Sequence, residues 1–145
     1  MKLTTRSRFG LRFMVNLGLN YGKGPVYLKE ISQKEEISEK YLSQLALFLK
    51  SAGLISSVRG IHGGYVLNRK PSQIRLLEVI EALEGDLNLT PCIQDVSQCS
   101  RIAVCATREV WLRMENALKE VLISITLEDL ISIYKGKAAN LSYHI

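Results

Sequence analysis

The sequence predicts a mainly α-helical fold with one small β-hairpin, and three observations indicate it. Apolar residues recur every three to four positions in several segments, as they do on the buried face of a helix. A glycine-rich turn, residues 59–64, separates two short segments that are typical of paired strands. An apolar repeat of seven in the second half is typical of a helix that pairs with a copy of itself. The 145 residues suffice for one domain with an appended oligomerisation element.

Three helices are predicted in the first part of the chain. Thr4 or Thr5 can cap a first helix that runs to about residue 21, and the glycine- and proline-containing segment 22–25 then ends it. A short second helix is predicted for residues 28–35, and Ser38, after the next turn, is well placed to cap a third. Two helices joined by so short a turn are typical of a helix-turn-helix motif.

A two-stranded hairpin is predicted directly after the third helix. Gly53 closes that helix at the position that favours a left-handed backbone. Residues 54–58 then read as a strand and residues 65–67 as the returning strand, with Arg59 at the tip of the turn between them. Three helices followed by such a hairpin have the order of a winged helix-turn-helix.

The third helix and the hairpin have the chemistry of a surface that reads DNA. One stripe of the helix is apolar, while the residues between are short or polar side chains with one cation, namely Lys40, Ser43, Gln44, Leu47 and Ser51. In a major groove Gln44 can pair with an adenine edge, Ser43 can donate or accept, and Lys40 can reach a guanine or a phosphate. Arg59 can reach a narrow minor groove, where the negative potential is deepest. The residues predicted to contact DNA are Ser38, Lys40, Tyr41, Ser43, Gln44, Arg59, Gly60 and His62.

The charge distribution agrees with this interpretation. Residues 1–75 hold 13 Lys or Arg against 4 Asp or Glu, a net charge of +9, whereas residues 76–145 hold 6 against 10, a net charge of −4. The positive field therefore lies on the half that contains the third helix and the hairpin, as a phosphate-binding face requires. Two alternatives stay open from the residues alone, namely a basic surface that is merely solvated and a helix-turn-helix that touches no DNA.

The second half predicts a connecting helix, an irregular loop and a long helix. Residues 76–83 form the connecting helix, Gly85 stops it, and periodicity then disappears until about residue 101. The sevenfold repeat on the long helix indicates self-pairing, although Val110 and Leu122 widen the apolar face and leave packing within its own chain as the alternative. The repeat comprises Val104, Trp111, Leu118 and Ile125, joined by Met114 and Val121.

Thr126 and Asp129 form a start resembling a capping box for a short last helix, and we expect the residues after it to be frayed. The sequence thus predicts one domain with four parts. These are a winged helix-turn-helix region at 1–75, a connecting helix and cysteine loop at 76–102, a dimerisation helix and C-terminal helix at 103–136, and a tail at 137–145.

The expected location is the cytoplasm. Arginines at positions 6, 8 and 12 interrupt the N-terminus before the apolar core of a secretory signal can form, and no run of 18 apolar residues is long enough to cross a membrane. Three cysteines are an odd number, and a cytoplasmic compartment is reducing. Free thiols or a metal site are therefore expected in place of a disulfide framework.

The three cysteines favour an iron–sulfur cluster over a zinc site. Cys92, Cys99 and Cys105 are separated by six and five residues, whereas a zinc knuckle needs a gap of two to four within a ligand pair. Three thiolates on a flexible loop and a helix start suit a larger, softer group, either a [2Fe-2S] or a [4Fe-4S] cluster. The alternative is that free cysteines pack as small hydrophobic residues, which suits Cys105 better than the other two.

Taken together, these motifs resemble the Rrf-type (Rrf-two) family of bacterial winged-helix regulators, almost from end to end. The resemblance implies a dimeric transcription factor with an iron–sulfur cluster on the three-cysteine loop, whose DNA affinity changes with the state of the cluster. The residues that carry it are Lys2-Leu3-Thr4, Gly24-Pro25-Val26, Tyr41-Leu42, Gln44-Leu45, Gly53-Leu54, Ser56-Ser57-Val58-Arg59-Gly60, Gly63-Gly64-Tyr65, Cys105, Thr107, Trp111 and Ile125-Thr126-Leu127.

The sequence departs from the family pattern where a fourth cluster ligand is expected. Arg108 stands where cluster regulators have a histidine, and Arg8 stands where nitric-oxide-sensing members have an aspartate. Glu109 and Asp95 are the weaker candidates for the fourth ligand, and an open or weakly held position is the version we favour. Ser43 also replaces a glutamate that reads DNA in the family, so the operator sequence cannot be transferred.

The sequence therefore predicts a homodimeric repressor that binds a near-palindromic double-stranded DNA operator and senses iron–sulfur status, redox state or nitric oxide. A regulator of the same fold without a cluster, controlled by a partner protein or by thiol oxidation, is the main alternative, and a structural zinc protein is another. We expect no enzymatic activity. His62 lies on the hairpin and His144 near the C-terminus, and the sequence contains no Ser/His/Asp grouping and no phosphate loop.

Overall fold

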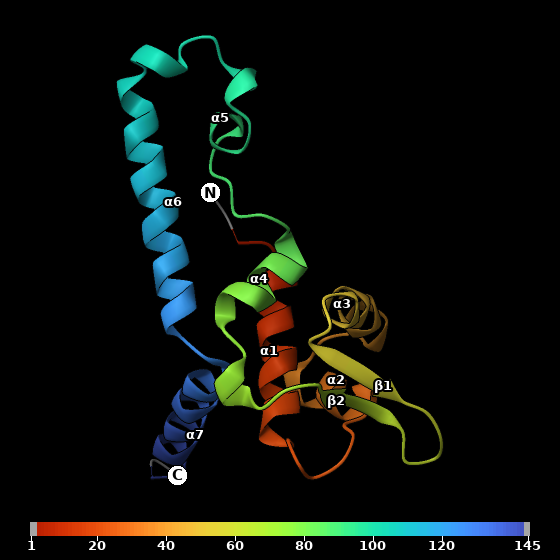
Figure 1. Ribbon diagram of the computed structural model, residues 1–145. Coiled ribbons are helices and arrows are strands. Elements are labelled where there is room, and N and C mark those ends of the chain that lie inside the picture. The colour runs from red at the N-terminus through yellow and green to blue at the C-terminus, as the bar shows by residue number, and fades with distance from the viewer. Residues whose placement is uncertain (1–2, 144–145) are drawn as a thin grey trace.

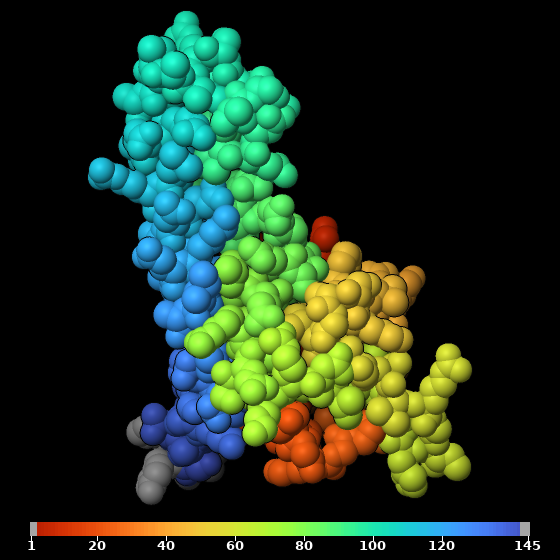
Figure 2. Space-filling model, viewed as in Figure 1, coloured from red at the N-terminus to blue at the C-terminus, as the bar shows by residue number. Residues whose placement is uncertain are grey.

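The computed structural model describes residues 3–143 and confirms the mainly helical fold with a single hairpin (Figure 1). A helical body carries the hairpin on one side, and a long helix with its preceding segment extends from the body as an arm (Figures 1 and 2). The elements of the body and hairpin are α1 (Thr5–Leu19), α2 (Leu28–Glu35), α3 (Glu39–Ser51), β1 (Ile55–Val58), β2 (Gly64–Leu67), the 3₁₀ turn η1 (Pro71–Gln73) and α4 (Leu76–Glu84).

Capping side chains set the starts of α1 and α3 as predicted. Thr4 caps α1, and its hydroxyl accepts a hydrogen bond from the backbone N–H of Arg6 at 3.2 Å. Ser38 caps α3, accepting from the backbone N–H of Tyr41 at 3.1 Å. Gly53 follows α3 with φ +74°, as expected for a residue that closes a helix in the left-handed region. The helix-turn-helix order is therefore confirmed.

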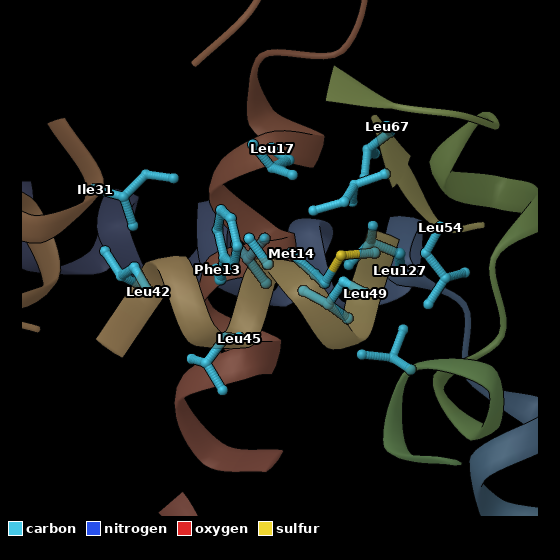
Figure 3. Close-up of a cluster of buried hydrophobic side chains, with 14 of the residues drawn as sticks. Phe13, Met14, Leu17, Ile31, Leu42, Leu45, Leu49, Leu54, Leu67 and Leu127 are labelled. Atoms are coloured by element: carbon cyan, nitrogen blue, oxygen red, sulfur yellow. The ribbon is translucent and has the colours of Figure 1, made fainter. Parts of the chain in front are cut away.

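The core forms around α1, which contacts α2, α3, α4, α7 and β2. Its inward residues Phe13, Met14 and Leu17 meet the buried stripe of α3 and side chains from α2, the hairpin and α7 (Figure 3). Close approach is possible because Gly10 and Gly18 lack side chains: a Cβ at either position would overlap Leu83 of α4 or Ile131 of α7. This one helix thus holds α2, α3, α4 and α7 together.

The arm consists of short turns that lead into α6, and the chain then returns to the body (Figure 1). The segment predicted as irregular, residues 86–101, contains only short single turns of helix. α6 contacts α4 and α5, and α7 packs on α1 and η1. The elements of this half are α5 (Pro91–Gln94), η2 (Val96–Gln98), η3 (Ile102–Val104), α6 (Ala106–Ser124) and α7 (Leu127–Tyr143).

The last helix starts as predicted but is longer. The Thr126 backbone N–H donates to the Asp129 carboxylate at 2.9 Å and the Asp129 N–H donates to the Thr126 hydroxyl at 3.1 Å, which is the reciprocal capping box expected. The prediction of a frayed tail from residue 137 is wrong, because α7 continues to Tyr143. A single glycine, Gly136, costs only about 1 kcal/mol in a helix, and the alanines that follow favour helix.

The predicted heptad seam on α6 is divided between two faces. Trp111 and Leu118 are half-buried and border hollows that they share with Leu89, in the segment before α5, so they serve packing within the chain. Met114 and Val121 are 45% and 54% exposed. The apolar face of α6 is therefore wide: one side of it packs against other parts of the same chain, and the other side is exposed.

The carboxylate of Glu84, the last residue of α4, holds the N-terminus of α1. It accepts from the Thr4 backbone N–H at 3.1 Å, from the Ser7 hydroxyl at 2.7 Å, and from the Thr4 hydroxyl. Partial burial raises the pKa of Glu84, but these hydrogen bonds outweigh the burial and the pKa is lowered overall.

No helix within residues 3–143 is long and apolar enough to cross a membrane.

We predict that Glu84→Gln lowers the free energy of unfolding at neutral pH by roughly 1 kcal/mol, the value of a hydrogen bond to a charged group at a half-exposed site. Because the folded-state pKa of Glu84 lies below its ordinary value of 4.5, this contribution is present above that value and is lost as the pH falls through the folded pKa. Urea unfolding at neutral pH and in acid measures the difference. Glu120→Gln, on an exposed part of α6, is the control, and an equal loss for Glu84→Gln in acid would contradict the assignment.

Candidate nucleic-acid interface

The predicted DNA-reading residues of α3 divide into two groups. Lys40, Ser43 and Gln44 are exposed on the outer face, opposite the fully buried residues of the inner stripe. Ser38 and Tyr41 instead hold the helix in place. Ser38 is the N-cap, and the hydroxyl of Tyr41 lies 3.0 Å from the Thr5 hydroxyl of α1. The outer face is thus presented by a helix whose position is set from behind.

The hairpin presents the other predicted group at its tip. β1 and β2 pair antiparallel, with Val58 opposite Gly64, and residues 59–62 are all exposed beyond that pair. The turn depends on missing side chains: a Cβ at Gly63 would overlap the Val58 carbonyl oxygen, and one at Gly64, where φ is +141°, would overlap the Val26 carbonyl. Arg59, Gly60 and His62 therefore project together from a tight, well-defined tip.

Several contacts fix the hairpin relative to the helical body. Val26 and Tyr65 exchange backbone hydrogen bonds of 3.0 and 2.9 Å, which extends the sheet by one bridge. The Lys50 ammonium of α3 donates to the Ser57 hydroxyl of β1 at 3.0 Å. Tyr27 donates its hydroxyl hydrogen to the carbonyl of Ile61 near the tip. The helix and the hairpin are consequently held as one surface (Figure 1).

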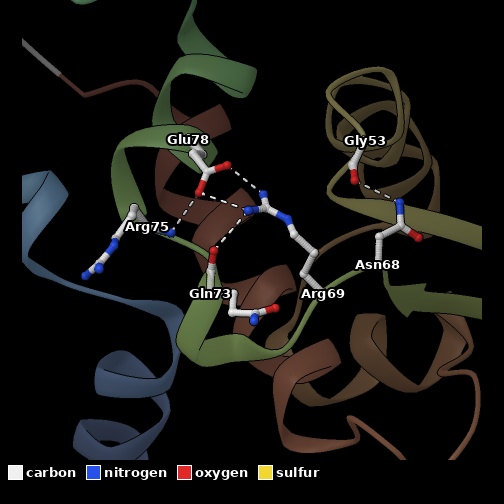
Figure 4. Close-up of polar contacts among 6 residues, drawn as sticks. All are labelled: Gly53, Asn68, Arg69, Gln73, Arg75 and Glu78. Atoms are coloured by element: carbon white, nitrogen blue, oxygen red, sulfur yellow. Dashed lines mark hydrogen bonds and ion pairs between the residues drawn. The ribbon is translucent and has the colours of Figure 1, made fainter.

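The base of the hairpin is tied to α3 and α4 by polar contacts (Figure 4). Asn68 donates to the Gly53 carbonyl at 2.8 Å, and the Arg69 guanidinium pairs with the Glu78 carboxylate at 2.6 Å. Glu78 also accepts from the Arg75 backbone N–H at 3.0 Å. Burial raises the pKa of Glu78, but the hydrogen bonds from Arg69 and Arg75 outweigh it and lower the pKa overall.

Sequence reasoning missed two residues of this surface. Lys50 lies on α3 beside the hairpin, and Arg6, from the start of α1, stacks its guanidinium over the Phe48 ring at 5.2 Å. Both add exposed cations to the side that carries α3. Leu47, which helical spacing places on the outer face of α3, is 65% exposed there, although the prediction gave it no contact with DNA.

The three cysteines lie along the arm as free thiols. Cys92 is in the first turn of α5, Cys99 follows η2, and Cys105 is the N-cap residue of α6. Within residues 3–143, no three His, Cys, Asp or Glu side chains gather closely enough to hold a metal ion. The structure therefore places the cysteines in one segment but does not bring them together as a ligand set.

The candidate fourth ligands and their surroundings are also defined. The carboxylate of Asp95 caps η2 and accepts from Ser97 and Gln98, and the Ser97 hydrogen bonds lower its pKa. Glu109 is exposed in the first turn of α6. The pKa of the Cys105 thiol is lowered by hydrogen bonds from the Thr107 hydroxyl and the Arg108 backbone N–H, which stabilise the thiolate.

Arg108 and His144 were also discussed from the sequence. Arg108 is half-buried, and its Nε has no hydrogen-bond partner within the described residues. His144 lies outside the described residues, so its position cannot be compared with the cysteine segment.

Comparison with known proteins identifies a matching family and several similar proteins. A family described as Rrf2, iron-dependent transcriptional regulator, matches residues 3–133. The transcriptional regulator CymR of Bacillus subtilis is 41% identical over 145 residues, covering 100% of both chains. IscR of Escherichia coli O1:K1 is 38% identical over 132 residues, covering 91% of this chain and 81% of IscR. The solved structure of CymR, the global cysteine regulator of B. subtilis, matches with a TM-score of 0.78 and 42% identity, covering 92% of this chain and 98% of CymR.

We predict that Arg59→Ala weakens binding to duplex DNA by about 1–3 kcal/mol, because an arginine at the hairpin tip would neutralise phosphate charge in a narrow minor groove. The measurement is a set of binding isotherms across a salt series, on a duplex obtained by randomised-site selection with the unmodified protein. Lys135→Ala removes one exposed cation from α7 and is the matched control. Isotherms for Arg59→Ala that coincide with those of the unmodified protein at every salt concentration would rule the contact out.

Proposed function

Because this chain belongs to the Rrf2 family of transcriptional regulators, we propose that it represses transcription as a homodimer bound to a near-palindromic DNA operator. The observation that carries the proposal is the joined surface of α3 and the hairpin. This surface has an exposed polar helix face, an arginine at the hairpin tip and contacts that keep the two in register.

The proposed binding mode assigns different tasks to the two elements. The outer face of α3 enters the major groove, where Gln44 pairs with an adenine edge and Lys40 reaches a guanine or a phosphate. Ser43 donates or accepts a hydrogen bond at a neighbouring base. The hairpin tip, with Arg59, Gly60 and His62, lies in the adjacent minor groove. The net charge of +9 on residues 1–75 supplies the attraction to phosphate that both contacts need.

The proposed dimer forms through an outer stripe on α6, which comprises Val110, Met114 and Val121. All three are about half exposed, and at 100° per residue they fall on one side of the helix, roughly a quarter turn from the face that packs on α4 and α5. Apolar residues four and seven apart on an exposed helix support pairing with a second copy. A two-fold dimer then explains why the operator is expected to be a near-palindrome.

We predict that Val121→Glu makes the protein monomeric and reduces operator binding, because the dimer would have to bury an unpaired carboxylate. The expected rise in the dimer dissociation constant is about 100-fold or more. Sedimentation velocity over a concentration range measures it. Asn116→Glu places the same charge on an exposed part of α6 away from both apolar faces and is the control. A Val121→Glu protein that sediments as the unmodified dimer would show that the stripe is not the interface.

We propose that the cysteine segment is the regulatory element and that Cys92, Cys99 and Cys105 ligate a [2Fe-2S] or [4Fe-4S] cluster. Support comes from three free thiols on one segment, from the iron-dependent description of the family, and from similarity to IscR. As folded here the thiols do not form a ligand set, so a cluster would require the segment to close around it. Glu109 and Asp95 stay the weaker candidates for a fourth ligand, since Asp95 is already engaged in capping η2.

A regulator without a cluster is the second candidate, controlled by a partner protein or by thiol oxidation. Two observations favour it: the dispersed cysteines, and 41% identity along the whole chain with CymR, whose solved structure is described as that of a cysteine regulator. It needs only one reactive thiol, and the exposed Cys99 is accessible.

We predict that anaerobically purified protein absorbs visible light and contains iron and acid-labile sulfide. Replacing any one of the three cysteines with serine should abolish this absorption, because each thiolate would be a ligand. Glu109→Ala and Asp95→Ala should leave it largely intact if the fourth position is open. A colourless, iron-free protein that still binds its operator would contradict the proposed cluster. It would favour control by thiol oxidation or by a partner protein.

A further inference from the structure

An exposed leucine stands in the middle of the DNA-facing side of α3. Leu47 is 65% exposed, although the inner stripe of the same helix, represented by Leu45 and Leu49, is fully buried. It lies three positions after Gln44 and four after Ser43, so all three share one face of the helix. The core is complete without Leu47, which leaves its side chain free for another contact.

The surroundings of Leu47 form a shallow hollow suited to a small apolar group. The hollow encloses about 390 Å³ and is lined by Gln44, Leu47, Phe48 and Ser51. Phe48 is partly covered by the guanidinium of Arg6 at 5.2 Å. Leu47 is therefore the most open apolar side chain of the hollow, and polar side chains border it on both neighbouring turns.

We propose that Leu47 reads thymine, by packing its methyl groups against the C5-methyl of a thymine in the major groove. Thymine is the only base that presents a methyl group there, and an apolar contact is the usual way in which proteins detect it. The inference rests on the proposed DNA-binding function. It assigns to the same helix a base contact that its polar residues cannot make.

Charge and spacing favour DNA as the occupant of this hollow. Cations surround the outer face of α3, with Lys40 and Lys50 on the helix itself and Arg6 beside it. Gln44 and Leu47 are one helical turn apart, about 4.5 Å along the helix axis, so a helix that brings Gln44 to a base edge also brings Leu47 to the same groove.

Replacing thymine with deoxyuracil tests this directly, because it removes the methyl group and keeps every hydrogen-bonding group. Each thymine of a selected operator is replaced in turn, in both half-sites, and affinities are measured for the unmodified protein and for Leu47→Ala. The unmodified protein should lose about fourfold affinity per half-site at one symmetric position, as expected for one buried methyl group. Leu47→Ala should bind thymine and deoxyuracil equally at that position.

Leu141→Ala makes the same change at a leucine of α7 that is 68% exposed and outside this hollow, so it is the matched control and should keep the full sensitivity to deoxyuracil. Strong operator binding that is insensitive to every deoxyuracil replacement would overturn the role of Leu47 and leave the proposed function intact. Undiminished sensitivity in Leu47→Ala would overturn it equally. An unmodified protein that selects no duplex at all would overturn both the inference and the proposed function.

Discussion

The burial of α1 is the constraint on which the rest of the structure depends. The elements α2, α3, α4, α7 and β2 pack on this helix, and the contacts with α4 and α7 are close because two positions of α1 carry no side chain. Gly10 receives Leu83 of α4, and Gly18 receives Ile131 of α7. Because Tyr41 and Phe9 also meet edge-to-face at 5.9 Å, α1 helps to set the position of α3 as well. Changes along α1 would therefore be felt at both ends of the molecule.

α4 is the element that links the DNA-facing surface to the cysteine segment. Near its start, Glu78 holds Arg69 at the exit of the hairpin, and at its end Glu84 holds the first turn of α1. The chain then enters the cysteine segment directly, and α6 returns along α4. α4 therefore contacts the exit of the hairpin at one end and leads into the cysteine segment at the other.

Local signals were enough to predict most of the fold, and the misses came from contacts between distant parts. Thr4, Ser38, Gly53 and the Thr126–Asp129 pair mark helix ends through their own hydrogen bonds or backbone conformation, so spacing alone finds them. The division of the α6 apolar face depends on how α6 lies against α4 and α5, which periodicity cannot specify. The relative positions of the three sulfur atoms depend on the path of the whole arm, so the spacing of the cysteines indicates a chemistry but no geometry.

The two faces of α3 differ in their contribution to stability. The inner stripe is sealed in the core, and the outer face, with Lys40, Ser43, Gln44 and Leu47, contributes nothing to that packing. Substitutions on the outer face therefore cost little stability, and a duplicated copy of the gene could acquire a new target sequence without passing through unfolded intermediates. In this way one fold can serve several regulators in the same genome, each with a different target sequence.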